Sequence, residues 1–328
     1  ATGGLKWVTT PQLCGFTCSS GNFSVALGFQ AGGALTPTGF SNVFVGYNAG
    51  CQMSGGDYNV AVGNSSLQGT GSSNVAIGAG AMGQTASTGN NNVAIGYQSA
   101  DALTSGANNI AIGQGSLGAS TTASDQVAIG HRAGCTNTVG AQSVYVGSNA
   151  GLLSNSVGSV FVGFCAGQAN TTAGCGTYLG YVSGRNATGL SNTYVGALTG
   201  CAASNTSACG TFLGFCSGSA VTTGNGNNFI GFQAGRNVNT GGFNVAIGTA
   251  AFQTATSAAN NVAVGCGALA GLSTTAGNTA LGHRAMLNAS TAANNVAIGC
   301  SAGEQISTGS TNVFIGNTAG DAVTTGSS

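Results

Sequence analysis

The feature that most constrains this chain is a short motif that returns at a nearly fixed interval. In the copy at 91–96, Asn-Asn-Val-Ala-Ile-Gly, two aliphatic residues flank an alanine and a glycine closes the motif. Eighteen recognisable copies follow one another from residue 21 onward, at spacings of 15 to 18 residues and most often 17. A short, fixed period is typical of stacked repeats and not of a conventional globular domain.

Each copy predicts a short strand followed by a turn. Side chains alternate along a strand, so the first and third strand residues share one face. We assign these aliphatic positions to the structural core; examples are Val75, Ile77, Val93, Ile95, Ile112, Ile247 and Ile298. The closing glycine supplies a turn conformation that other residues resist. Examples of these turn glycines are Gly78, Gly96, Gly113, Gly248 and Gly299.

The middle strand position faces the other way and is apolar in every copy. It is Ala in ten copies and aromatic in eight, at Phe44, Tyr145, Phe161, Tyr178, Tyr194, Phe212, Phe229 and Phe314. An exposed stripe of this kind would be a larger apolar patch than soluble monomers normally tolerate. We therefore expect the aromatic row to be an oligomer interface.

A polar position precedes each strand. Asn stands four residues before the closing glycine in twelve copies, among them Asn42, Asn92 and Asn244. Stacked at about 4.8 Å, these side chains would form an amide ladder between coils. The chain is thus predicted to be an all-β β-solenoid (β-roll) of about eighteen 17-residue coils, most simply with two short strands and two turns per coil. The solenoid would occupy 21–328, with 1–20 as an N-terminal cap or a junction.

Charge and residue placement disfavour several functions. Charged residues make up 3% of the chain, and five basic residues cannot form the positive groove that nucleic acid requires. No apolar run approaches the roughly 20 residues that span a bilayer, so we expect no membrane insertion. Asp and Glu are scattered, and His131 and His283 lie nine coils apart, where we expect exposed surface positions. We predict no enzyme, no catalytic residues, no cofactor and no metal site.

Eleven cysteines are present, which is a high number for a repeat chain. No two of them occupy the same column of adjacent coils, so the spacing excludes a regular disulfide ladder. We interpret them as small apolar side chains that stay reduced. Pairing across columns, such as Cys165 with Cys175 or Cys209 with Cys216, remains open.

The repeats resemble those of two known families. The motif at 73–78, 91–96 and 294–299 is similar to the head repeats of trimeric autotransporter adhesins. The longer unit from 91 to 106, with Gly-Tyr-Asn-Ala-Gly at 46–50 and Gly-Phe-Gln-Ala-Gly at 231–235, is still closer to repeats of phage and large-virus tail-fibre proteins. The resemblance covers about 21–328. It implies a parallel homotrimer of β-solenoids that acts as a rigid fibre or adhesive head on a virion or a cell surface, with a host receptor or surface glycan as its partner.

Two other functions are compatible with the repeats. One is a subunit that stacks end to end into an extracellular filament, with 1–20 as the joint. The other is a monomeric ice- or glycan-binding solenoid, which would need a regular threonine grid on one face. The threonines at 85–88, Thr104 and Thr222-Thr223 are instead expected in irregular turns.

Overall fold

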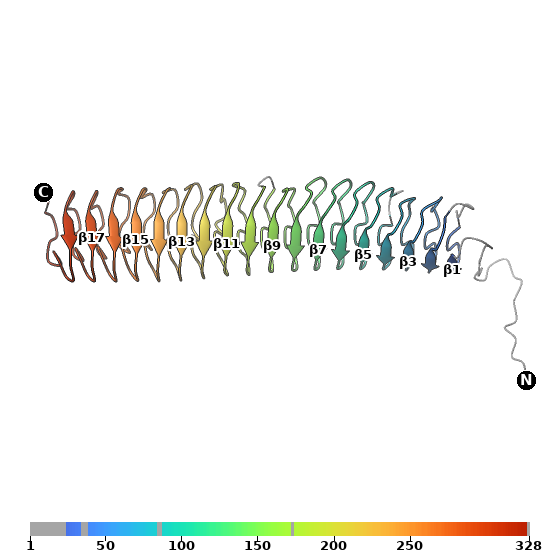
Figure 1. Cartoon of the computed structure of the whole chain (residues 1–328), viewed down its shortest axis with the longest axis horizontal. Helices are drawn as coiled ribbons and strands as arrows, with labels where there is room; N and C mark the ends of the chain where they lie inside the picture. Colours follow the sequence, from blue (N-terminus) through green and yellow to red (C-terminus); the bar gives the residue numbers. More distant parts are fainter. Residues whose placement is uncertain (1–23, 34–38, 84–86, 172–173, 327–328) are drawn as a thin grey trace, which may run out of the picture. The chain divides into compact units, whose positions relative to one another are not determined.

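The computed structural model describes residues 24–33, 39–83, 87–171 and 174–326, and its regular elements are eighteen three-residue parallel strands (Figure 1). The predicted cap at 1–20 lies outside the described residues. The described chain contains no helix, and hence none able to cross a membrane. The strands are β1 Val25–Leu27, β2 Val43–Val45, β3 Val60–Val62, β4 Val75–Ile77, β5 Val93–Ile95, β6 Ile110–Ile112, β7 Val127–Ile129, β8 Val144–Val146, β9 Val160–Val162, β10 Thr177–Leu179, β11 Thr193–Val195, β12 Thr211–Leu213, β13 Asn228–Ile230, β14 Val245–Ile247, β15 Val262–Val264, β16 Thr279–Leu281, β17 Val296–Ile298 and β18 Val313–Ile315.

The strands stack in two compact units, residues 1–148 with β1–β8 and residues 149–328 with β9–β18. Inside each unit, every strand pairs in parallel with the strand of the next coil, and equivalent positions face each other. Ala246, for example, lies opposite Ala263, which in turn lies opposite Ala280. The predicted β-solenoid is therefore confirmed.

Each coil holds one strand, whereas the sequence suggested two. The reason is a run of left-handed residues after the strand, at the second and fourth positions beyond the closing glycine. In the coil of β5 these are Gln98 (φ 51°) and Ala100 (φ 49°). Alternation of left-handed and ordinary residues turns the chain too sharply for an extended segment to form.

The two faces of the strand are used the opposite way from the prediction. The middle residues point inward: Phe44, Tyr145, Phe161, Tyr178, Tyr194, Phe212 and Phe229 are fully buried within the chain, and Phe314 in the last strand is half-buried. They form the core and not the expected interface. The positions assigned to the core lie on the outer face, where Val75, Val93, Ile95 and Ile112 are half-buried and Ile77, Ile247 and Ile298 are exposed. Period-2 alternation shows which residues share a face but not which face the coil closes around.

In many coils, core volume is exchanged between two positions. Wherever the middle strand residue is aromatic, the residue six positions later is glycine, as in Phe229 and Gly235. A Cβ added at Gly235 would lie 2.4 Å from the Phe229 ring, so the ring occupies that space. In the next coil the order is reversed, with Ala246 in the strand and a fully buried Phe252 six residues later. These two coils thus fill one narrow core from different positions.

Five aromatic rings form a continuous buried stack in the second unit. The centroids of successive rings lie 4.8, 5.0, 4.5 and 5.2 Å apart through Phe161, Tyr178, Tyr194, Phe212 and Phe229. Parallel, in-register strands force this arrangement because equivalent side chains are separated by only one coil.

The predicted asparagine ladder is present and buried. The backbone N–H and side-chain amide of Asn261 both donate to Oδ1 of Asn244, at 3.0 and 3.2 Å. Asn278 donates to Asn261 Oδ1 in the same way, at 2.9 and 3.2 Å. Each asparagine therefore supplies hydrogen bonds that the buried backbone at the start of the strand would otherwise lack.

The closing glycines have the turn conformation expected of them, and they also lie unexpectedly close to the next coil. Gly248 has φ 131°, a region that residues with a Cβ rarely adopt. A Cβ there would also lie 2.7 Å from the carbonyl group of Gly265 in the next coil. Gly78, Gly96, Gly113 and Gly299 share the positive φ and the close approach. The column is restricted to glycine by backbone conformation and by the coil spacing together.

Candidate interaction surface and polar network

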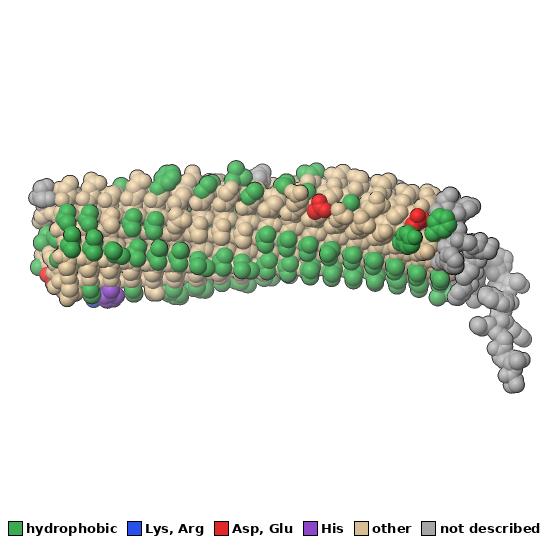
Figure 2. All heavy atoms as spheres, viewed as in Figure 1, with side chains coloured by type: hydrophobic (Ala, Val, Ile, Leu, Met, Phe, Trp, Pro, Cys, Tyr) green, Lys and Arg blue, Asp and Glu red, His purple; other side chains and the backbone are tan. Residues whose placement is uncertain are grey.

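The outer strand face carries rows of exposed aliphatic side chains in both units (Figure 2). The third residue of every strand is aliphatic, and so is the first residue except in β10–β13 and β16, where it is Thr or Asn. Several of these aliphatic side chains are about 38% exposed, as Val160 and Ile247 are. Because consecutive strands are in register, the third-position residues form a row through every coil of a unit, and the first-position residues form a second row that polar residues interrupt in the second unit. The result is an apolar stripe, which we call the strand stripe.

Aromatic residues directly after the closing glycine widen the strand stripe. Phe164 stacks on Tyr181 with centroids 5.5 Å apart, and Phe215 stacks on Phe232 at 5.6 Å. These rings are 44 to 55% exposed. Since an aromatic side chain presents about 150–250 Å², four half-exposed rings leave on the order of 400 Å² of apolar surface in the second unit alone. That value already equals the largest patch of a typical soluble monomer, before any aliphatic residue is counted.

Formal charge is absent from the strand positions of the described residues. Arg132 and Arg284 stand two residues after a closing glycine, and Arg185, Arg236 and Glu304 stand five after one. The strand stripe could therefore be buried without removing a charge from water, which is a typical property of an interface core.

Hydroxyl side chains form a second regular surface feature, against the expectation of irregular turns. In the second unit, Ser273 Oγ donates to the carbonyl of Ser290 at 2.9 Å, and Ser290 Oγ donates to that of Ser307 at 3.2 Å. In the first unit, Thr104 Oγ1 donates to the carbonyl of Thr121 at 2.9 Å. The residue that directly follows this position in the chain is exposed, and its hydroxyl has no hydrogen-bond partner among the described residues. In the second unit these residues form one line along the coils, which we call the hydroxyl file: Thr223, Thr240, Ser257, Thr274, Thr291 and Thr308.

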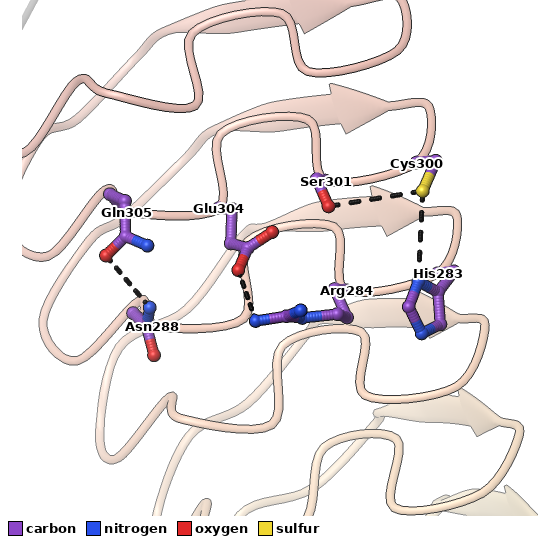
Figure 3. A network of polar contacts seen from close by, with 7 residues as sticks. All are labelled: His283, Arg284, Asn288, Cys300, Ser301, Glu304 and Gln305. Atoms are coloured by element: carbon purple, nitrogen blue, oxygen red, sulfur yellow. Dashed lines mark hydrogen bonds and ion pairs between the residues drawn. The ribbon is translucent and has the colours of Figure 1, made fainter.

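A polar network joins the coils of β16 and β17 (Figure 3). The Arg284 guanidinium forms an ion pair with Glu304 at 2.5 Å, and Asn288 Nδ2 donates to Gln305 Oε1 at 3.0 Å. At the other end of the network, Cys300 Sγ lies 3.8 Å from Nδ1 of His283. Both partners of this thiol–imidazole pair are exposed.

The two histidines are both exposed, as the sequence predicted, but their surroundings differ. His131 occupies the same Gly-His-Arg-Ala frame as His283, yet Gln114 and Ser148 fill its column in the neighbouring coils. His283 has Cys266 in the preceding coil and Cys300 in the following one. The sequence signal for this pair is the column directly after the closing glycine, where a cysteine occurs in both coils next to His283.

All nine described cysteines are free, so neither of the pairings left open, Cys165 with Cys175 or Cys209 with Cys216, is formed. Burial raises the pKa of the Cys165, Cys201 and Cys216 thiols. As the described side chains stand, no three His, Cys, Asp or Glu residues gather in a metal-binding arrangement.

Comparison with known proteins adds no relative: no family model and no curated protein matches the chain.

Proposed function

We propose that the chain is a structural fibre protein, and that copies of it associate through the strand stripe into a rigid parallel homotrimer that serves attachment at a virion or cell surface. The observation that carries the proposal is the uncharged apolar stripe that recurs in every coil. Left in water, such a surface would recruit another chain.

Another copy of the same chain suits this surface best because its rows have the same spacing. The outer side chains repeat at the coil rise of about 4.8 Å. A parallel copy presents the same repeat, so side chains can interdigitate at each coil and not only at one end. Rotational symmetry closes such an assembly, whereas an unrelated globular partner would match few rows. The threefold order is the one that the resemblance to tail-fibre and adhesin repeats implies.

Sedimentation equilibrium of the purified chain tests the proposal. We expect three times the chain mass of 31.3 kDa. Replacing two outer strand residues in the double variant Val160→Lys/Val262→Lys places charge in the interface and should shift the mass towards the monomer. Thr240→Lys, an exposed change off the strand, is the matched control and should leave the mass unchanged. A monomeric parent protein would overturn the proposal, and open-ended polymers would favour the end-to-end filament.

The hydroxyl file favours a second candidate, binding of an extended surface glycan. Its exposed hydroxyls form one line, because the hydroxyls of the preceding residues Thr256, Ser273, Ser290 and Ser307 donate to backbone carbonyls. A single line suits a linear polymer better than the two-dimensional lattice of ice. The triple variant Thr240→Val/Thr274→Val/Thr291→Val removes three hydroxyls at nearly constant volume. Glycan-array binding that is lost in this variant would support the candidate, and binding by neither protein would reject it.

A further inference from the structure

Cys300 and His283 form an exposed thiol–imidazole pair in the second unit (Figure 3). His283 directly follows Gly282 and Cys300 directly follows Gly299, so the two residues stand in one column of adjacent coils. The Ser301 N–H donates to the His283 carbonyl at 2.9 Å and fixes this register. Cys300 Sγ lies 3.8 Å from His283 Nδ1. We propose that Cys300 is a reactive thiol that exchanges with low-molecular-weight disulfides, and that His283 accepts its proton.

Exposure and an imidazole contact together distinguish Cys300 from the other described cysteines. Four of the nine described thiols are exposed: Cys175, Cys209, Cys266 and Cys300. Of the sulfurs in the described residues, only that of Cys300 is hydrogen-bonded to an imidazole nitrogen. The thiolate and not the thiol is the nucleophile, and an ordinary cysteine is mostly protonated at neutral pH. A proton acceptor beside the sulfur therefore favours reaction at Cys300 over the other exposed thiols.

The groups around the sulfur are compatible with a thiolate. Ser301 Oγ lies 4.0 Å from Cys300 Sγ, so its hydroxyl can donate a weak hydrogen bond to the anion. Arg284 follows His283 in the chain, and its guanidinium is directed to Glu304 and paired with that carboxylate (Figure 3). Because this ion pair neutralises Glu304, the carboxylate does not oppose a negative charge on the sulfur.

The exchange conserves atoms and electrons. His283 Nδ1, unprotonated in the neutral imidazole that carries its proton on Nε2, takes the proton of the Cys300 thiol. The thiolate attacks one sulfur of the incoming disulfide, a new S–S bond forms at Cys300, and the old S–S bond breaks. The leaving thiolate takes up the proton. The incoming disulfide is the only oxidant required, and it yields one mixed disulfide with the protein and one free thiol.

The test uses glutathione disulfide as the probe and the full-length chain as the target. Peptide mass spectrometry at successive times gives the rate at which each cysteine gains a glutathionyl group. We expect Cys300 to react faster than Cys175, an exposed thiol without an imidazole contact among the described residues, which serves as the internal standard. A positioned base contributes typically 10²–10⁴-fold, so His283→Asn should slow the Cys300 reaction by at least about tenfold. His131→Asn is the matched control and should leave the rate unchanged.

The first unit allows the same pair to be built at a second place. His131 is exposed and occupies the same Gly-His-Arg-Ala frame as His283. Strands β7 and β8 pair in register, so Ser148 stands one coil after His131, as Cys300 stands one coil after His283. Ser148→Cys should therefore add a second fast thiol, which His131→Asn should slow by at least about tenfold for the same reason.

Three outcomes would overturn the proposal. They are a Cys300 rate no higher than that of Cys175, an equal Cys300 rate in the parent and in His283→Asn, and a new thiol in Ser148→Cys that reacts no faster than Cys175. The pair belongs to one chain, so none of these outcomes bears on the proposed trimer.

Discussion

The exchange of core volume between two positions of a coil yields a sharp stability prediction for the coil of β13. Phe229 and Gly235 fill that coil, and the next coil holds the reverse pair, Ala246 and Phe252. Gly235 and Phe252 both have positive φ, 58° in each case, so the second coil shows that this backbone accepts an aromatic side chain. We therefore expect Phe229→Ala and Gly235→Phe to compensate for each other.

The magnitudes follow from the geometry. Phe229→Ala leaves a cavity and should cost about 3–5 kcal/mol, since the ring is fully buried and stacked on Phe212. Gly235→Phe alone puts a Cβ 2.4 Å from the Phe229 ring. Overpacking and the left-handed backbone should together cost about 2–5 kcal/mol. In the double variant the cavity and the clash cancel, and only the backbone cost of about 1–2 kcal/mol remains.

Native-state hydrogen exchange is the suitable assay because stacked coils can open locally instead of unfolding in one step. The free energy of opening is compared for amides of β13 and β14 in the parent, both single variants and the double variant. The exposed change Thr240→Ala serves as a control and should alter this free energy by less than about 0.5 kcal/mol. A double variant whose loss equals the sum of the two single losses would refute the reasoning.

Further predictions concern the backbone, the ladder and the buried phenols. Gly248→Ala should cost more than Gly316→Ala in opening free energy, because both have similar φ but the added Cβ clashes only at Gly248. Asn261→Ala should cost about 2–4 kcal/mol, measured by hydrogen exchange of β15 and β16, since it leaves buried hydrogen-bonding groups unpaired. Burial raises the pKa of Tyr178 and Tyr194 above the ordinary value of about 10. Their stabilising contribution is therefore complete below about pH 10 and is lost as the pH rises further, so Tyr178→Phe should flatten the alkaline fall in thermal stability.

Much of the fold could be predicted from the sequence because the evidence is repeated eighteen times. The glycine in every copy indicated a turn conformation that the structure confirms, and the asparagine column indicated the amide ladder. Both are local properties: they depend on the residue type and on its register with the same position one coil away. Averaging over many copies removes the ambiguity that a single three-residue strand would have.

The surface was predicted less well, because its residues come together only when the coil closes. Thr240 and Thr274 fall into one file only after the turns are set. His283 and Cys300 are 17 residues apart in the sequence and yet have side chains in contact. Alignment by column predicts such neighbours, but not whether their side chains point towards each other.

The sequence alone therefore determined the period, the strand position, the glycine turns and the ladder, all of which follow from local geometry. Which face of the strand lies inside follows only from the closed coil. Ala94 and Phe229 are buried while Ile95 and Ile247 lie on the surface, because a 17-residue coil encloses a core only one side chain thick. The inward position must then be small, or aromatic beside a glycine. Alternation along a strand groups the residues into two faces but does not distinguish the inner face from the outer one. Closure of the coil makes that distinction.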